Sequence, residues 1–110
     1  MQLTQTREHL LAALQITLGA IERRHTSPIL ENVLLRIQGT QCHWRGTDLE
    51  IEIATHTPLL DGNDGAITLP ARKFADICKS LPADSLVTLV IDDNQRARIS
   101  AGRSRFELAT

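Results

Sequence analysis

The sequence predicts an α+β domain in which two helices pack on one face of mostly antiparallel sheets. The chain has 110 residues, the size of one domain, since chains divide into several domains only beyond about 250 residues. Its segments follow the order strand, helix and three strands, and this order occurs twice. Short turns join successive strands, which favours antiparallel pairing, and two helices must then cover one face of the sheets.

The first unit opens with a strand and a helix. Thr6 can cap this helix, because its hydroxyl accepts an otherwise unpaired backbone N–H, and Glu8 suits the positive end of the helix dipole. Leucines recur at helical spacing from Leu10 to Leu18, and Gly19 predicts the end of the helix. Turns are expected at 38–40 and 46–47, and the four strands of the unit at 1–6, 29–37, 42–45 and 48–56.

The second unit repeats this order with almost no residue identity to the first. Pro70 is expected in the first turn of its helix, where proline is favoured. Apolar residues from Phe74 to Leu81 line one helix face, and Pro82 ends the helix. The segment 58–64 is expected to be a loop, and the strands of the unit are expected at 66–69, 86–91, 96–101 and 103–110.

Composition excludes several classes of protein. The net charge of −1 excludes a uniformly basic nucleic-acid binder, although it allows a local basic face. Aromatic residues make up 3% of the chain, which argues against a module that stacks nucleic-acid bases. Cys42 and Cys78 lack the spacing of a disulfide framework or a zinc site, so we expect two buried or half-buried thiols in a reducing cytoplasm. We expect no signal peptide, no membrane span, no metal and no cofactor.

Basic residues gather in three places: after the first helix, on the second helix and in the last 15 residues, which hold Arg96, Arg98, Arg103 and Arg105. Arg23 and Arg24 follow the first helix, and Arg72 and Lys79 lie two turns apart on the second, away from its apolar face. Asp76 lies near that exposed face and weakens its field. An ordinary solvated helix face and a binding face both fit this pattern.

The last strand alternates in character. Arg103, Arg105 and Glu107 lie on one face, and Phe106 and Leu108 on the other. A terminal strand is expected at a sheet edge, where charge usually prevents aggregation. The same edge could dock an acidic partner, so both interpretations stay open on the residues alone.

Nothing in the sequence argues for catalysis. Asp48, Glu50 and Glu52 share one strand face, which fits a metal-dependent nuclease, but we favour a solvated outer sheet face. Cys42 and His43 are neighbours on a strand, so they point to opposite faces and cannot easily chelate one ion. The other histidines, His9, His25 and His56, are interpreted as isolated surface residues. The serines of the chain lie in no nucleophile motif.

Five stretches span the chain from end to end. They are Arg7-Glu8-His9-Leu10-Leu11, Pro28-Ile29-Leu30-Glu31-Asn32, Gly46-Thr47-Asp48-Leu49-Glu50, Pro70-Ala71-Arg72-Lys73-Phe74-Ala75-Asp76-Ile77-Cys78 and Gly102-Arg103-Ser104-Arg105-Phe106. Taken together and in this order, they resemble the N-terminal domain of the bacterial DNA polymerase III β subunit, the sliding-clamp family.

The resemblance implies a non-catalytic DNA-clamp domain of the DNA polymerase III holoenzyme. In the family, two subunits of three domains each join head to tail into a ring around double-stranded DNA, with helices lining the hole. By resemblance, Arg24 and Arg72 are DNA-contacting positions, with Arg23, Lys79 and Arg7 as further candidates. Lys73, Arg96, Arg103 and Arg105 correspond to the basic side of the subunit interface, and Phe106 and Leu108 to its apolar centre.

The chain departs from the family in length. Residues 1–110 correspond to the first domain alone, so we expect the second and third domains to be absent, and with them the binding sites for polymerase and clamp loader. We therefore expect this chain alone to be a monomer that cannot encircle DNA, because a head-to-tail junction needs both complementary faces. A protein-binding adaptor and a metal-dependent nuclease remain the alternative functions.

Overall fold

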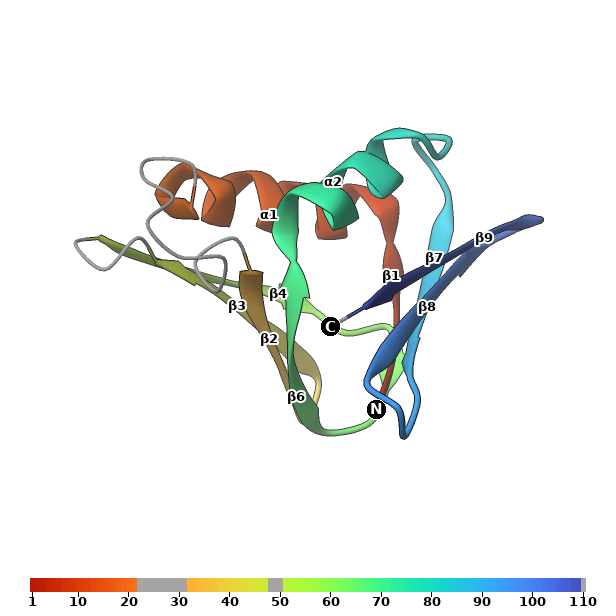
Figure 1. Cartoon of the computed structure of the whole chain (residues 1–110), viewed down its shortest axis with the longest axis horizontal. Coiled ribbons are helices and arrows are strands. Elements are labelled where there is room, and N and C mark those ends of the chain that lie inside the picture. Colours follow the sequence, from red (N-terminus) through yellow and green to blue (C-terminus); the bar gives the residue numbers. More distant parts are fainter. Residues whose placement is uncertain (22–31, 48–50, 110) are drawn as a thin grey trace.

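The computed structural model describes residues 1–21, 32–47 and 51–109, and in these the two helices lie on one side of the β-sheets (Figure 1). The predicted duplicated order of segments is confirmed, with one short additional strand. In chain order the elements are β1 (Gln2–Thr6), α1 (Arg7–Ile21), β2 (Asn32–Gln38), β3 (Gln41–Thr47), β4 (Glu52–Pro58), β5 (Asp61–Gly62), β6 (Gly65–Pro70), α2 (Ala71–Lys79), β7 (Leu86–Ile91), β8 (Arg96–Ala101) and β9 (Ser104–Ala109).

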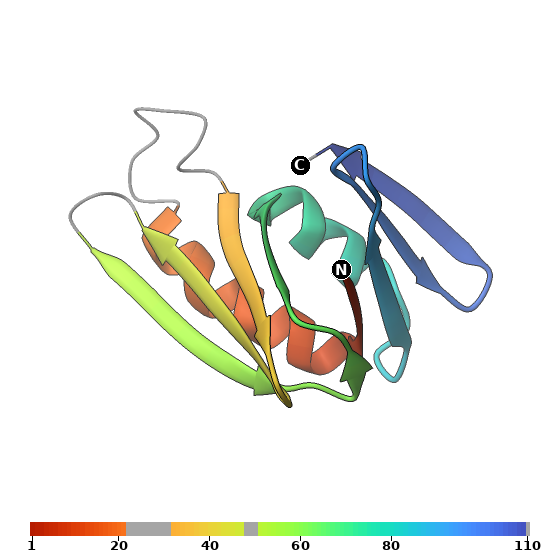
Figure 2. The same ribbon diagram turned by 90° about the horizontal axis from the view of Figure 1, so that it is seen from below.

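The strands form two antiparallel sheets. One has the order β5-β1-β7-β8-β9, and the other β4-β3-β2-β6. Each sheet contains three consecutive strands of one unit and the first strand of the other unit, because β1 pairs with β7 and β6 pairs with β2. Figure 2 shows the two sheets side by side with both helices behind them. The predicted α+β class is therefore confirmed, and the two units exchange their first strands.

Several predicted boundaries hold, others differ by one or two residues, and four of the differences change an element or the role of a residue. The strands at 86–91 and 96–101 are confirmed at both ends, because polar turn residues separate an apolar run from an alternating one. Gly19 does not end α1, which continues to Ile21. The turn expected at 46–47 is part of β3.

The other two errors concern Pro70 and the loop before it. Pro70 is the N-cap residue of α2, with extended backbone angles (φ −67°, ψ 106°), and not a residue of the first turn. Within the segment expected to be a loop, β4 extends to Pro58, and Asp61–Gly62 forms β5 against β1. The residues expected to connect α1 to the next strand lie outside the described part of the chain.

Helix α1 begins where the sequence predicts. The backbone N–H of His9 donates to the Thr6 hydroxyl oxygen at 3.2 Å, so the predicted cap is formed. Glu8 lies in the first turn, where its charge favours the positive end of the helix dipole. The buried Thr17 hydroxyl donates to the carbonyls of Ala13 and Leu14, at 3.0 and 3.1 Å, so its polar atom is satisfied inside the core.

The core lies between the helices and the two sheets. Trp44 on β3 and Phe74 on α2 are fully buried, with ring centroids 6.4 Å apart and planes tilted by 43°. The Trp44 indole N–H donates to the Thr57 hydroxyl oxygen at 3.1 Å, which satisfies the one polar atom of that side chain. Leu10 and Leu14 bring the buried face of α1 to the same cluster. The predicted apolar faces of both helices are thus confirmed.

Both cysteines are free thiols in this core, as expected. Burial raises the pKa of Cys78 to about 12, and the nearby Arg7 charge opposes this shift only in part. Burial also raises the pKa of Cys42, against a hydrogen bond with Thr57 that lowers it. Both thiols therefore stay protonated and unreactive at neutral pH. Among the described helices, none is long and apolar enough to cross a membrane.

Candidate functional site

The exposed side of α2 is the most basic helical surface in the described part of the chain. Its buried residues include Ala71 and Phe74, which pack into the core and fix the helix orientation. The residues exposed on the other side are Arg72, Lys73, Asp76 and Lys79, that is, three cations and one carboxylate. The sequence prediction that Arg72 and Lys79 are exposed is confirmed. This arrangement can attract phosphate groups through charge without recognising bases.

Arg7, the first residue of α1, differs from these exposed cations. Its side chain is only 17% exposed, and its Nε donates to the Cys78 carbonyl oxygen at 3.0 Å. A second guanidinium nitrogen lies 2.6 Å from a carboxylate oxygen of Glu8. Arg7 thus ties the start of α1 to the end of α2. The other two candidates for DNA contact, Arg23 and Arg24, lie outside the described residues.

Strand β9 forms the edge of the five-stranded sheet, as the sequence predicts. Phe106 and Leu108 are half-buried, whereas Arg105 and Glu107 are exposed, so the predicted alternation is confirmed. Phe106 lies opposite Ile99 of β8 and packs against the edge of the core rather than within it. The outer edge of β9 has no neighbouring strand among the described residues, and its backbone groups are available to another chain.

The charges around β9 differ in their partners. Arg96 Nε lies 2.5 Å from a carboxylate oxygen of Glu107, so Arg96 is already bound to the neighbouring strand. Arg103 and Arg105 are exposed and form no ion pair with any other described residue. A groove of about 530 Å³ is lined by Arg105 together with Val90, Arg98 and Glu107, among others. Lys73, which the resemblance also assigns to the subunit interface, lies on α2 and not on this sheet.

Asp92 holds the turn that joins β7 to β8. Its carboxylate accepts the backbone N–H of Arg96 at 3.1 Å and that of Asn94 at 2.9 Å. The hydrogen bond from the Arg96 N–H is the main reason why the pKa of Asp92 is lowered. Desolvation opposes it as the next-largest effect, and the Asn94 N–H and the charges of Arg98 and Arg96 lower the pKa further. The charged carboxylate therefore fixes the point at which the basic strand β8 begins.

The strand face predicted to carry Asp48, Glu50 and Glu52 shows no metal site among its described residues. Glu52 is exposed, and its carboxylate lies 2.7 Å from Arg45 Nε, while Asp48 and Glu50 lie outside the described residues. Within residues 1–21, 32–47 and 51–109, no group of three or more His, Cys, Asp or Glu side chains is placed to hold a metal ion.

The histidine prediction needs one correction. His56 is not isolated, because it lies directly opposite His43 on the neighbouring strand, with ring centroids 6.3 Å apart. His9 is exposed as predicted, and His25 lies outside the described residues. Cys42 is buried and His43 exposed, so the prediction that they point to opposite faces is confirmed.

The fold is an α+β domain in which a duplicated unit places two helices on antiparallel sheets. Comparison with known proteins identifies the family that has this fold. The family model described as "DNA polymerase III beta subunit, N-terminal domain" matches residues 1–110. The chain belongs to this family.

Named relatives and solved structures agree with this assignment. The chain is 50% identical over its whole length to a protein named "Beta sliding clamp" from Pseudomonas putida and covers 30% of that protein. A protein of the same name from Vibrio harveyi is 44% identical, with 76% of it covered. The crystal structure of the Pseudomonas aeruginosa DNA polymerase III subunit beta gives a TM-score of 0.92 at 47% identity, covering 99% of this chain and 30% of that one. The Caulobacter crescentus polymerase sliding clamp gives 0.92 at 40% identity, covering 99% and 30%.

Proposed function

We propose that this chain forms the first of three domains of a sliding clamp, a ring that encloses double-stranded DNA and tethers the replicative polymerase for processive synthesis. The proposal assigns the chain no catalytic role. The observation that carries it is the exposed pair of cations Arg72 and Lys79 on α2, in a domain of the β-subunit family. The proposed place of action is the bacterial cytoplasm, where two free thiols would stay reduced.

A clamp needs weak attraction to DNA. Duplex DNA carries one charge per about 1.7 Å of its axis, so a few cations suffice to hold the phosphates without reading the sequence. In this chain, Arg72 and Lys79 are the proposed phosphate contacts on α2, at opposite ends of the helix. Arg23 and Arg24 are proposed to add to them from the connector. The proposal needs little from Arg7, because its guanidinium is already bound to Cys78 and Glu8.

We further propose that β9 forms one half of the junction between two subunits of the ring. The unpaired edge of β9 would continue a sheet of the second subunit, with Phe106 and Leu108 at the apolar centre. Arg103 and Arg105 would meet carboxylates there, since they have no ion-pair partner among the described residues. Lys73 and Arg96 would lie at the border of the junction. Polymerase and clamp loader are proposed to bind outside these 110 residues.

Fluorescence anisotropy with a labelled DNA duplex tests the phosphate contacts. We expect wild-type binding no tighter than about 1 µM at physiological salt, because non-specific affinities are typically 10⁻⁴ to 10⁻⁶ M. The double variant Arg72→Ala/Lys79→Ala should bind several-fold more weakly. The slope of the logarithm of the binding constant against the logarithm of the salt concentration should be shallower by about 1.8. Each lost phosphate contact reduces this slope by about 0.9, and the variant loses two contacts.

The matched control is Arg36→Ala, which removes an exposed cation from β2 on the sheet face away from the helices. This variant should bind the duplex as the wild type does. Equal losses in the control and in the α2 variant would contradict the proposed contact surface. Metal-dependent cleavage of the duplex that is lost in Glu50→Gln would contradict the non-catalytic role.

A further inference from the structure

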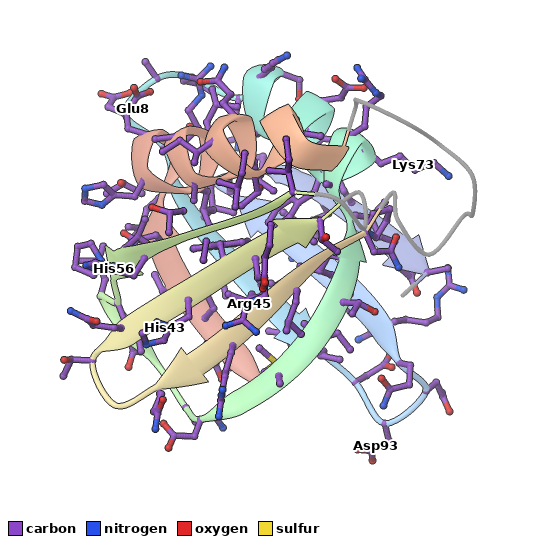
Figure 3. All side chains as sticks on the ribbon, turned by 90° about the vertical axis from the view of Figure 1, so that its left-hand side faces the viewer. Glu8, His43, Arg45, His56, Lys73 and Asp93 are labelled. Atoms are coloured by element: carbon purple, nitrogen blue, oxygen red, sulfur yellow. The ribbon has the colours of Figure 1, made fainter. Side chains whose placement is uncertain are left out.

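The outer face of the four-stranded sheet carries a second cluster of basic groups, on the side of this sheet away from the helices. Arg36 on β2, His43 on β3 and His56 on β4 lie opposite one another across three strands. Arg45 lies in the next row of the same face, and all four side chains are exposed. Figure 3 shows His43, Arg45 and His56 together on this face of β3 and β4. We call these four residues the outer sheet patch.

The patch has little compensating negative charge. Of the outward-facing residues that the structure describes on β2, β3, β4 and β6, Glu52 alone is acidic. Its carboxylate lies 2.7 Å from Arg45 Nε, with both side chains more than half exposed. This contact shows that a carboxylate can reach the Arg45 guanidinium at the sheet surface. Arg36 has no ion-pair partner among the described residues, so one guanidinium of the patch is unpaired.

The patch surrounds a shallow groove of about 310 Å³. Leu34 and Ala54 flank Arg45 in its row and contribute apolar surface to the groove between the charged side chains. Trp44 approaches from below, but its side chain is fully buried and offers no exposed ring. The groove therefore combines cationic groups with small aliphatic ones, and its exposed rings are the imidazoles of His43 and His56, with no exposed Trp, Phe or Tyr among the described residues that line it.

We propose that the outer sheet patch binds an acidic peptide segment of a protein partner, with carboxylates on the arginines and an aliphatic side chain beside Leu34 and Ala54. Arginine forks bind carboxylates through paired hydrogen bonds, which suits Asp or Glu side chains. A nucleic acid fits less well, because it would leave the aliphatic part of the groove uncovered. The proposed DNA contacts that the structure describes, Arg72 and Lys79, lie on α2, and the helices pack on the opposite face of the sheets.

Binding at this patch is expected to be weak and sensitive to salt, because exposed ion pairs contribute little individually and are screened. His43 and His56 lie beside Arg36, Arg45 and Glu52 on the same face, and their ring nitrogens add hydrogen-bonding groups for the peptide at the border of the groove.

Fluorescence anisotropy of the 110-residue chain tests the proposal, with a labelled peptide of alternating glutamate and leucine as the probe. The double variant Arg36→Gln/Arg45→Gln should bind this peptide at least fivefold more weakly. Arg98→Gln, a matched loss of an exposed arginine on the other sheet, should change the affinity less than twofold. A peptide with glutamine in place of glutamate should not bind. His43→Gln/His56→Gln keeps a hydrogen-bonding group at each position and should weaken binding less than the arginine double variant does.

Three results would overturn the proposal: no binding of the acidic peptide, equal losses in the patch variant and the Arg98 variant, or binding of the glutamine peptide with the same affinity. Preferential binding of a labelled single-stranded oligothymidine that Arg36→Gln/Arg45→Gln abolishes would assign the patch to nucleic acid instead. Amide spectra of each variant establish that it is folded. Duplex binding by the Arg72→Ala/Lys79→Ala variant is a separate measurement, so this proposal and the proposed clamp function can fail independently.

Discussion

The two helices occupy the same position in the two repeated units, yet they expose very different residues. Both pack an apolar face into one core, with Leu14 of α1 and Phe74 of α2 fully buried. The side exposed by α2 is basic, whereas the exposed residues described on α1 include Glu8, Gln15 and Ile16 but no lysine or arginine. The architecture thus determines which face of each helix is buried, while the exposed face is free to differ. Among the described residues, the exposed candidate DNA contacts, Arg72 and Lys79, both lie on the second helix.

The largest expected effect would test whether the buried faces are equivalent. Leu14→Ala and Phe74→Ala each leave a cavity in the shared core, so each should lower the free energy of unfolding, by about 2–5 and 3–5 kcal/mol respectively. Urea denaturation measures both. Ile16→Ala, at a side chain that is 49% exposed, should change stability by less than about 0.5 kcal/mol. A Leu14→Ala loss as small as that of Ile16→Ala would show that α1 is packed less tightly than α2.

A second difference concerns the polar residue on each buried face, Thr17 on α1 and Cys78 on α2. Burial raises the pKa of Cys78 from 9.0 to about 12, so the native state keeps a proton that the unfolded state loses. This stability is present below pH 9 and is lost as the pH rises from 9 towards 12, by at most about 1.4 kcal/mol per pH unit.

Urea denaturation between pH 8 and 10.5 measures this loss, and Cys78→Ala should reduce its slope. The hydroxyl of Thr17 does not titrate in this range, so Thr17→Val should leave the slope unchanged. An identical slope in wild type and Cys78→Ala would contradict the pKa argument.

The helix starts also differ, because Thr6 caps α1 through its hydroxyl, whereas the N-cap residue of α2, Pro70, makes no side-chain hydrogen bond. Thr6→Ala should lower the free energy of unfolding by about 1 kcal/mol. Thr6→Ser keeps the hydroxyl and should lose less than half as much. If both variants lose the same stability, the loss comes from packing of the methyl group rather than from the cap.

The smallest expected effect concerns the difference in charge between the exposed sides of the two helices, measured as a change in duplex affinity. Gln15→Lys adds a cation to the exposed side of α1 and should raise duplex affinity slightly, with a salt dependence steeper by about 0.9 if one phosphate contact is gained. Gln15→Glu should weaken binding. Fluorescence anisotropy at two or more salt concentrations measures both. Equal affinities of the lysine and glutamate variants would show that DNA does not approach α1.

Local patterns in the sequence predict most elements but not the pairing between distant ones. Alternation, turn residues and an N-cap predict β7, β8 and the start of α1. The exchange of first strands depends on contacts between residues far apart in the chain, such as Leu3 with Leu89, and no local pattern encodes these. Gly19 is tolerated inside α1 because packing outweighs its low helix propensity.

The candidate sites show the same division. The exposed cations of α2 and the alternation of β9 follow from helical and strand periodicity. The sequence does not predict the outer sheet patch, because a turn at 46–47 would place His43 opposite Glu50. In the structure β3 continues to Thr47, and Thr47 lies opposite Glu52. A hairpin centred three residues later brings His43 opposite His56. The position of that turn was therefore the signal that could have revealed the pair.

The exchange of β1 and β6 between the two units has a consequence for how this domain can be divided. Cleavage within 59–64 would separate two segments of similar length, but neither would hold a complete sheet, since each would keep a strand that belongs in the other. The halves should therefore fold only as a pair. If they were expressed as separate chains, each would act as the missing complement of the other, and the domain would become a heterodimer with the same core.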